Sequence, residues 1–182
     1  MKEIALNLLD LAENSLRAGA KRVAINLGER DGFVFLTIED DGCGMDEDFL
    51  SRVTDPYTTT RSTRNVGLGL PLAKMEAEMS GGSFSVQSRK NVGTKVSVTF
   101  QTDHIDRPPL GNVGESVSAL LADLNGTRLI FTYEAFGQSF VVDTQEILRQ
   151  LDGIPIDSPE ILVFVRELIQ ENIKTINGGI LL

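Results

Sequence analysis

The chain has 182 residues, 41% of them hydrophobic and 24% charged, a composition typical of a soluble globular protein. Its formal charge of −9 repels phosphate backbones, which argues against nucleic acid as the main partner. A single cysteine and a single histidine leave no internal disulfide and no Cys/His zinc cluster. No apolar run approaches the roughly 20 residues of a membrane span. We therefore expect a cytoplasmic protein that binds neither nucleic acid nor membrane.

The first predicted element is a helix from Lys2 to about Ala18 whose surface is sharply divided. Leucine, isoleucine and alanine residues recur on one side at helical spacing, while the other side carries Asn7, Asp10 and Asn14. Many polar stripes on helices only meet water. The helix alone therefore leaves two interpretations open, a solvated face or one wall of a binding site.

Two strands are predicted next. Residues 23 to 27 alternate apolar with polar or small side chains, and Phe33 to Asp40 does the same, which turns Asp40 inward. A buried carboxylate is unfavourable unless something donates hydrogen bonds to it, so a ligand with an amino group is a natural partner. The alternative is a turn-forming aspartate, because Asp40-Asp41-Gly42 also suits the exit from a strand.

Glycines and a polar stretch follow the second strand. Gly42 and Gly44 permit backbone angles that other residues resist, and they let a flat ligand approach the main chain. A short helix is predicted from Met45 to Val53. The segment from Thr54 to Val66 has no apolar rhythm, which is typical of a lid, and its hydroxyls and arginines suit phosphate oxygens.

A second glycine motif, Gly67-Leu68-Gly69, opens a predicted helix from Leu70 to about Met79. The free N–H groups and the positive end of the helix dipole make this terminus an anion site. Gly-x-Gly alone is a weak signal, since neither the phosphate-loop pattern nor the dinucleotide pattern is completed here.

Strands return at Phe84 to Ser88 and at Thr94 to Phe100, and the alternation in the last strand turns Thr94 towards the face that Asp40 occupies. Beyond them, Arg107-Pro108-Pro109 interrupts regular structure. We therefore divide the chain into a first domain, residues 1–103, and a C-terminal extension, residues 104–182.

The extension is predicted to contain a helix, a hairpin and two further helices. The hairpin turns near Phe136-Gly137, the short helix is capped by Asp143, and the last helix begins at Ser158-Pro159 and includes Phe164 among its apolar residues. Asn177 and the glycines after it are expected to fray. The extension has enough apolar residues to fold, or to dock on the first domain or on a partner.

Five motifs in this order resemble the GHKL superfamily of gyrase B, heat-shock chaperone ATPases, histidine kinases and mismatch-repair MutL. They are Asp10-x-x-x-Asn14, Asp40-Asp41-Gly42-Cys43-Gly44, Asp55-Pro56-Tyr57-Thr58-Thr59-Thr60-Arg61, Gly67-Leu68-Gly69-Leu70 and Gly93-Thr94. The best match is the ATP-binding domain of sensor histidine kinases. The resemblance implies an α+β Bergerat fold, an α/β sandwich in which helices cover one face of a mixed, mostly antiparallel sheet.

The resemblance also implies ATP and Mg²⁺ as ligands. Asn14 would ligate Mg²⁺, while Asp40 would accept a hydrogen bond from the adenine amino group, with Thr94 supporting it through water. Arg61 would contact the terminal phosphate from the lid. The other cofactor-binding residues that it implies are Gly42, Gly44, Thr60, Gly67, Leu68, Gly69 and Leu70.

Some residues depart from the family pattern. Asp10, the candidate catalytic residue, stands where hydrolytic members place a glutamate base and many histidine kinases an asparagine, so the reach of its shorter carboxylate stays open. Asp41 replaces the usual asparagine. The chain begins at the first motif, so we expect no preceding hairpin with a phosphoacceptor histidine. Its single histidine, His104, is interpreted as a surface residue of a polar linker.

Three functional hypotheses follow. The first is a Mg-ATP-binding, histidine-kinase-like signalling or regulatory protein that acts in trans on a partner protein. The second is an ATP-hydrolysing conformational switch with Asp10 as the base. The third is a noncatalytic nucleotide sensor attached to a larger enzyme, because the chain also resembles, more loosely, ATP-binding proteins found alongside multisubunit iron hydrogenases of anaerobes.

Overall fold

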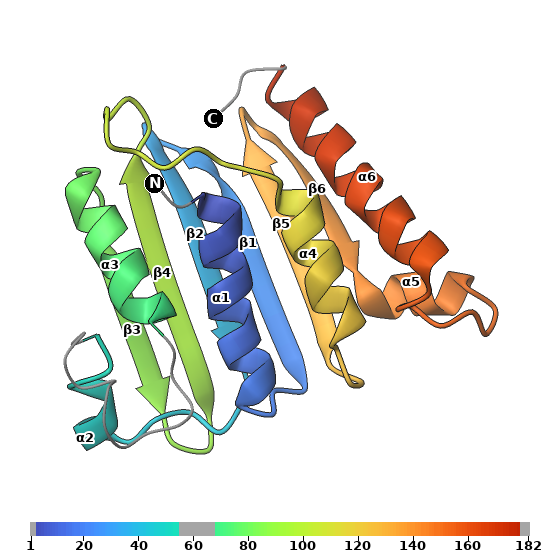
Figure 1. Cartoon of the computed structure of the whole chain (residues 1–182), viewed down its shortest axis with the longest axis horizontal. Helices are drawn as coiled ribbons and strands as arrows, with labels where there is room; N and C mark the ends of the chain where they lie inside the picture. The colour runs from blue at the N-terminus through green and yellow to red at the C-terminus, as the bar shows by residue number, and fades with distance from the viewer. Residues whose placement is uncertain (1–2, 55–67, 179–182) are drawn as a thin grey trace.

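The computed structural model describes residues 3–54 and 68–178, and every structural statement below refers to these residues. Within them, strands form one mixed sheet in the order β3-β4-β2-β1-β5-β6, in which only the β1–β5 pair is parallel. Helices α1, α3, α4 and α6 cover one face of this sheet (Figure 1). The predicted α+β sandwich is confirmed.

The elements of the sandwich follow one another along the chain with these bounds: α1 (Ile4–Arg17), β1 (Arg22–Arg30), β2 (Phe33–Asp40), α2 (Glu47–Leu50), α3 (Gly69–Met79), β3 (Phe84–Arg89), β4 (Gly93–Gln101), α4 (Val113–Ala122), β5 (Arg128–Ala135), β6 (Gln138–Asp143), α5 (Thr144–Gln150) and α6 (Pro159–Ile176). None of the helices in this described part of the chain combines the length and the apolar character that crossing a bilayer demands.

Strand alternation places the inward side chains as the sequence predicts. Apolar side chains at every second position of β1, β2 and β4 are buried beneath the helices and form one continuous core. Asp40 ends the buried row of β2, and in the register it is paired with Val23 of β1 and with Thr94 of β4. Asp40 and Thr94 are therefore direct cross-strand neighbours on the helix-covered face.

The polar stripe of α1 is only partly solvated. Asn7 is 1% exposed, and its Nδ2 donates to Glu76 Oε2 of α3 at 2.6 Å. Ser15, near the other end of the helix, is also buried. The solvated-face interpretation is wrong for Asn7, because α3 packs against α1 at this residue.

The C-terminal extension continues the sheet. β5 pairs in parallel with β1, β6 completes the predicted hairpin, and α4 packs between α1 and α6. The extension folds and also docks on the preceding part of the chain, while docking on a partner stays a prediction. The domain boundary near residue 103 stays a prediction.

Two local expectations were wrong, the length of the short helix after β2 and the fraying of Asn177. α2 is shorter than the predicted helix from Met45 to Val53. It starts directly after Asp46, the N-cap residue, whose side chain accepts from Phe49 N at 2.9 Å. In the last helix, α6, the buried face runs through Val165, Ile169 and Ile173, while Phe164 is 58% exposed.

Asn177 does not fray. It is 4% exposed, and its Oδ1 accepts from the Tyr133 hydroxyl at 2.5 Å. Burial of the phenol raises the pKa of Tyr133 to about 12. This hydrogen bond ties the end of α6 to β5, which sequence reasoning about a glycine-rich terminus did not anticipate.

Candidate functional site

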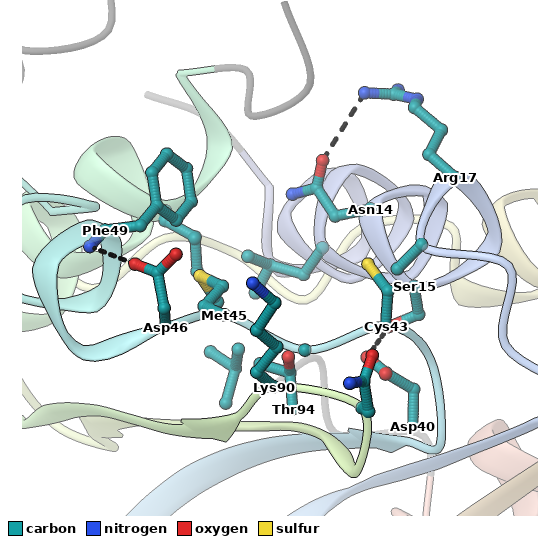
Figure 2. A pocket seen from close by; sticks show the side chains of 16 residues that line it. Asn14, Ser15, Arg17, Asp40, Cys43, Met45, Asp46, Phe49, Lys90 and Thr94 are labelled. Atoms are coloured by element: carbon teal, nitrogen blue, oxygen red, sulfur yellow. Dashed lines mark hydrogen bonds between the residues drawn. The ribbon is translucent and has the colours of Figure 1, made fainter. Parts of the chain in front are cut away.

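A cavity of about 550 Å³ opens between α1, the loop that follows β2, the β3–β4 turn and the start of α3. Its volume lies within the range of about 300–1,000 Å³ that is usual for small-molecule sites. Figure 2 shows side chains from these segments converging on it. Leu11, Leu70 and Val96 supply apolar wall, which suits a flat ring system with polar groups at its edge.

Asp40 lies in this cavity and is held by two donors. Its Oδ2 accepts from Ser15 Oγ at 2.6 Å, and both side chains are labelled in Figure 2. Its Oδ1 accepts from Gly42 N at 2.9 Å. An ionised carboxylate has about four acceptor positions, so Asp40 retains capacity for a ligand amino group. The turn-forming role and the ligand-facing role, which the sequence left as alternatives, are compatible in this geometry.

The loop after β2 passes too close to its neighbours for larger residues. A Cβ at Gly42 would lie 2.9 Å from Ala18 Cβ and 3.0 Å from Asp40 Oδ1. Gly44 has φ +61°, and a Cβ there would lie 2.0 Å from the carbonyl oxygen of Arg89. These glycines let the loop form a thin wall between α1 and the β3–β4 turn.

Asp41 anchors the same loop from outside the cavity. Its Oδ1 accepts from Lys21 N at 2.7 Å and from Arg22 N at 2.8 Å. The hydrogen bond from Arg22 N, with that from Lys21 N, holds the pKa of Asp41 below its usual value. The departure from asparagine at this position is therefore accommodated by backbone donors next to β1.

The β3–β4 turn and the loop after β2 contribute cavity-lining residues that sequence reasoning missed. Lys90, Asn91 and Cys43 line the cavity beside Thr94, and Asn91 N donates to the carbonyl oxygen of Cys43 at 2.7 Å. Their closeness to the motifs in the sequence could have revealed them, because Cys43 lies between the glycines of one motif and Lys90-Asn91 shortly precede Gly93-Thr94.

The α1 wall carries Asn14, Ser15 and Arg17. Arg17 Nη1 donates to Asn14 Oδ1 at 3.4 Å (Figure 2), and the same guanidinium also pairs with Glu13. Ser15 was not predicted as a site residue, although it lies one turn of helix after Leu11 and directly beside Asn14. Because its hydroxyl donates to Asp40, α1 helps to hold the Asp40 carboxylate in place.

The start of α3 approaches α1 at Gly69. A Cβ there would lie 3.3 Å from Asp10 Cβ and 3.8 Å from Asn14 Nδ2. Leu70 lines the cavity, Leu68 is exposed, and Asp10 is not part of the lining as far as the described residues define it.

Three predicted site residues, Thr60, Arg61 and Gly67, lie outside the described residues. Their roles stay predictions. The structure thus brings together Asn14, Asp40, Gly44, Leu70 and Thr94 around one cavity.

The described side chains contain no group of three or more His, Cys, Asp or Glu residues that could hold a metal ion. A metal in this cavity would therefore draw most of its ligands from elsewhere. Mg²⁺ commonly keeps several waters and binds phosphate oxygens together with few protein ligands. Asn14, with its amide oxygen on the cavity wall, fits the role of one such ligand.

Comparison with known proteins identifies relatives of this architecture. The family described as histidine kinase-, DNA gyrase B-, and HSP90-like ATPase matches residues 2–104. A putative sensor histidine kinase NtrY-like from Rickettsia bellii is 29% identical over 58% of this chain and 17% of its own length. The sensor histidine kinase YkoH of Bacillus subtilis is 30% identical over 55% of this chain and 22% of its own.

A longer alignment and a solved structure extend the comparison. The autoinducer 2 sensor kinase/phosphatase LuxQ of Vibrio cholerae is 27% identical over 85% of this chain and 20% of its own length. The chain thus spans about a fifth of these relatives. The crystal structure of the N-terminal domain of a DNA repair protein superposes with a TM-score of 0.56 at 13% identity, covering 78% of this chain and 52% of that one, a likeness of fold alone.

Proposed function

We propose that this chain, which belongs to the histidine kinase-, DNA gyrase B-, and HSP90-like ATPase family, binds ATP with Mg²⁺ in the cavity and acts as a signalling or regulatory component on a partner protein. Its first part is homologous to the ATP-binding domains of sensor histidine kinases. The observation that carries the proposal is the pairing of Asp40 with Thr94 in a cavity that also contains Asn14.

Adenine recognition follows from the hydrogen-bonding character of Asp40. The 6-amino group of adenine donates, and the carboxylate only accepts, so the two match. Guanine carries a carbonyl oxygen at the same ring position, which would meet the carboxylate acceptor to acceptor. Since Asp40 is fixed by Ser15 and Gly42 N, it cannot turn away without losing these bonds. ATP is therefore favoured over GTP.

Metal binding follows from Asn14. When bound, Mg²⁺ neutralises charge on the phosphate oxygens. Asn14 would supply an amide oxygen to the ion, and the 3.4 Å contact from Arg17 Nη1 to that oxygen would then be given up. Arg17 keeps Glu13 as an ion-pair partner in either arrangement.

Calorimetry with ATP, ADP and GTP, with and without Mg²⁺, tests the binding proposal. We expect ATP to bind more tightly than GTP, and Mg²⁺ to strengthen the binding of ATP. Equal affinities for ATP and GTP would refute the role of Asp40. No nucleotide binding at all would refute the proposed function.

Action on a partner is tested by transfer of labelled phosphate. The chain would be incubated with γ-labelled ATP and with candidate acceptor proteins, and His104→Ala would control for labelling of the single histidine of this chain. We expect label on a partner and an unchanged yield in the His104 variant. Absence of label on every candidate, with ATP bound, would argue for the nucleotide-sensor hypothesis.

A second candidate function is an ATP-hydrolysing switch. It is favoured by the position of Asp10, whose Cβ would lie 3.3 Å from a Cβ at Gly69, next to the N-terminus of α3. The test is steady-state phosphate release by the parent, by Asp10→Asn and by Glu13→Gln, a matched change on the exposed side of the same helix. Hydrolysis that is equal in all three proteins would exclude Asp10 as the base.

A further inference from the structure

Ser88, in β3, is the centre of a hydrogen-bond cluster beside the cavity. Its Oγ accepts from Met45 N at 2.8 Å, and lies 3.0 Å from the carbonyl oxygen of Gly93 and 2.9 Å from Thr94 Oγ1. In the register of the sheet Ser88 is paired with Thr94, and Thr94 is paired with Asp40. One hydroxyl group therefore connects the loop after β2, the β3–β4 turn and a cavity-lining side chain.

These contacts determine where each hydroxyl hydrogen points. A serine hydroxyl has one hydrogen and two lone pairs. The N–H of Met45 uses one lone pair, and the carbonyl oxygen of Gly93 can only accept, so it takes the hydrogen of Ser88. The Thr94 hydroxyl must then donate to the remaining lone pair of Ser88. With its hydrogen used in this way, Thr94 Oγ1 offers only lone pairs to the cavity.

Asp40, across the strand from Thr94, has the same character. Its carboxylate accepts from Ser15 Oγ and from Gly42 N, and an ionised carboxylate has no hydrogen to offer. This part of the cavity therefore consists of acceptors. At ring position 6 an amino group can donate to these acceptors, whereas the carbonyl oxygen of a 6-oxopurine would meet them acceptor against acceptor, a repulsive arrangement that gives specificity.

We propose that Ser88 is a positioning residue for purine selectivity: by accepting the hydroxyl hydrogen of Thr94, it makes Thr94 an obligatory acceptor and so excludes 6-oxopurines. The inference rests on the proposed function, since it requires that a purine nucleotide occupies the cavity. Ser88 acts through Thr94 and does not itself line the cavity as the described residues define it.

The test compares ATP with inosine triphosphate, a 6-oxopurine nucleotide, by calorimetry in the presence of Mg²⁺. In Ser88→Ala the Thr94 hydroxyl can rotate and donate to the 6-oxo group. We expect the ratio of the inosine triphosphate and ATP dissociation constants to fall by roughly 3- to 10-fold, the scale of one neutral hydrogen bond. Ser88→Thr retains the hydroxyl and should keep the parent ratio.

A matched control exists beside the start of β3. Ser83, the residue before β3, has its Oγ 2.9 Å from Oγ1 of Thr99 in β4, and neither residue lines the cavity. Ser83→Ala should leave both dissociation constants unchanged. If Ser88→Ala raises the dissociation constants of ATP and of inosine triphosphate by the same factor, Ser88 has only a structural role and the inference is overturned. The proposed function still stands in that case if the parent protein binds ATP more tightly than inosine triphosphate.

A double-mutant cycle with Thr94→Val provides a second route. Without the Thr94 hydroxyl there is no hydrogen for Ser88 to direct, so adding Ser88→Ala to Thr94→Val should not change the ratio further. A further change would overturn the inference. A parent protein that binds neither nucleotide would overturn the proposed function and this inference with it.

Discussion

Replacing Asp40 with asparagine isolates the hydrogen-bonding character of the cavity. The asparagine oxygen can still accept from Gly42 N, and the Ser15 hydroxyl can reverse to accept from the new amide, so both contacts of 2.9 and 2.6 Å can persist. What is lost is the second carboxylate oxygen and its charge, opposite the adenine amino group. Mispairing of this kind costs about 1–3 kcal/mol, which corresponds to ATP binding weakened about 5- to 150-fold.

The assay is calorimetry with ATP and GTP on the parent, Asp40→Asn and Asp41→Asn. The Asp41 variant is a matched control, since a single oxygen of Asp41 accepts from both Lys21 N and Arg22 N and an asparagine oxygen can do the same. We expect the Asp41 variant to bind ATP like the parent, and Asp40→Asn to narrow the preference for ATP over GTP. Unchanged ATP affinity in Asp40→Asn would refute the reasoning.

Three further predictions concern the metal and the stability of the fold. Asn14→Ala should abolish most of the Mg²⁺-dependent gain in ATP affinity but keep the preference for ATP over GTP, as measured by titrations with and without Mg²⁺. If this variant loses the preference and keeps the Mg²⁺-dependent gain, Asn14 is not the magnesium ligand. Tyr133→Phe should lower stability at neutral pH by about 1–3 kcal/mol, because Asn177 Oδ1 loses its buried donor. Because the pKa of Tyr133 is raised from 10.0 to about 12, the parent should lose stability as pH rises between these values, and the variant should lack this loss in urea titrations. The hydrogen bonds from Arg128 lower the pKa of Asp143, so Asp143→Asn, which keeps a helix-capping side chain, should lower stability by about 1 kcal/mol at neutral pH. The difference in stability between variant and parent should shrink as the pH falls below 3.8, the ordinary pKa of an aspartate. A difference that does not depend on pH in melting experiments would contradict this prediction.

Local sequence patterns determined most of the elements and the position of the key acid. The alternation of apolar residues along β2 is a property of the strand itself, so it predicts that Asp40 points inward without knowledge of any neighbour. The same argument predicts the orientation of Thr94 in β4, and the spacing of Asp10 and Asn14 places them on one side of α1.

Tertiary structure alone decided which polar groups meet. The burial of Asn7 against Glu76 depends on α3 packing across α1, and these residues are far apart in the sequence. The placement of β5 beside β1 likewise depends on a pairing between distant segments, which an alternating pattern allows but does not select.

The hydrogen bonds that hold the cavity-lining side chains in place were also decided by the tertiary structure alone. Ser15 holds Asp40 from a different element, and Ser88 joins Met45 N to Thr94 across the β3–β4 turn. Periodicity tells which way a side chain points from its own backbone, but a hydrogen-bond partner depends on the distance between two backbones that the sequence pattern does not encode. The sequence by itself therefore determined that Asp40 and Thr94 point to the same face, and only the packed structure decided which other side chains join them at the cavity and what holds them there.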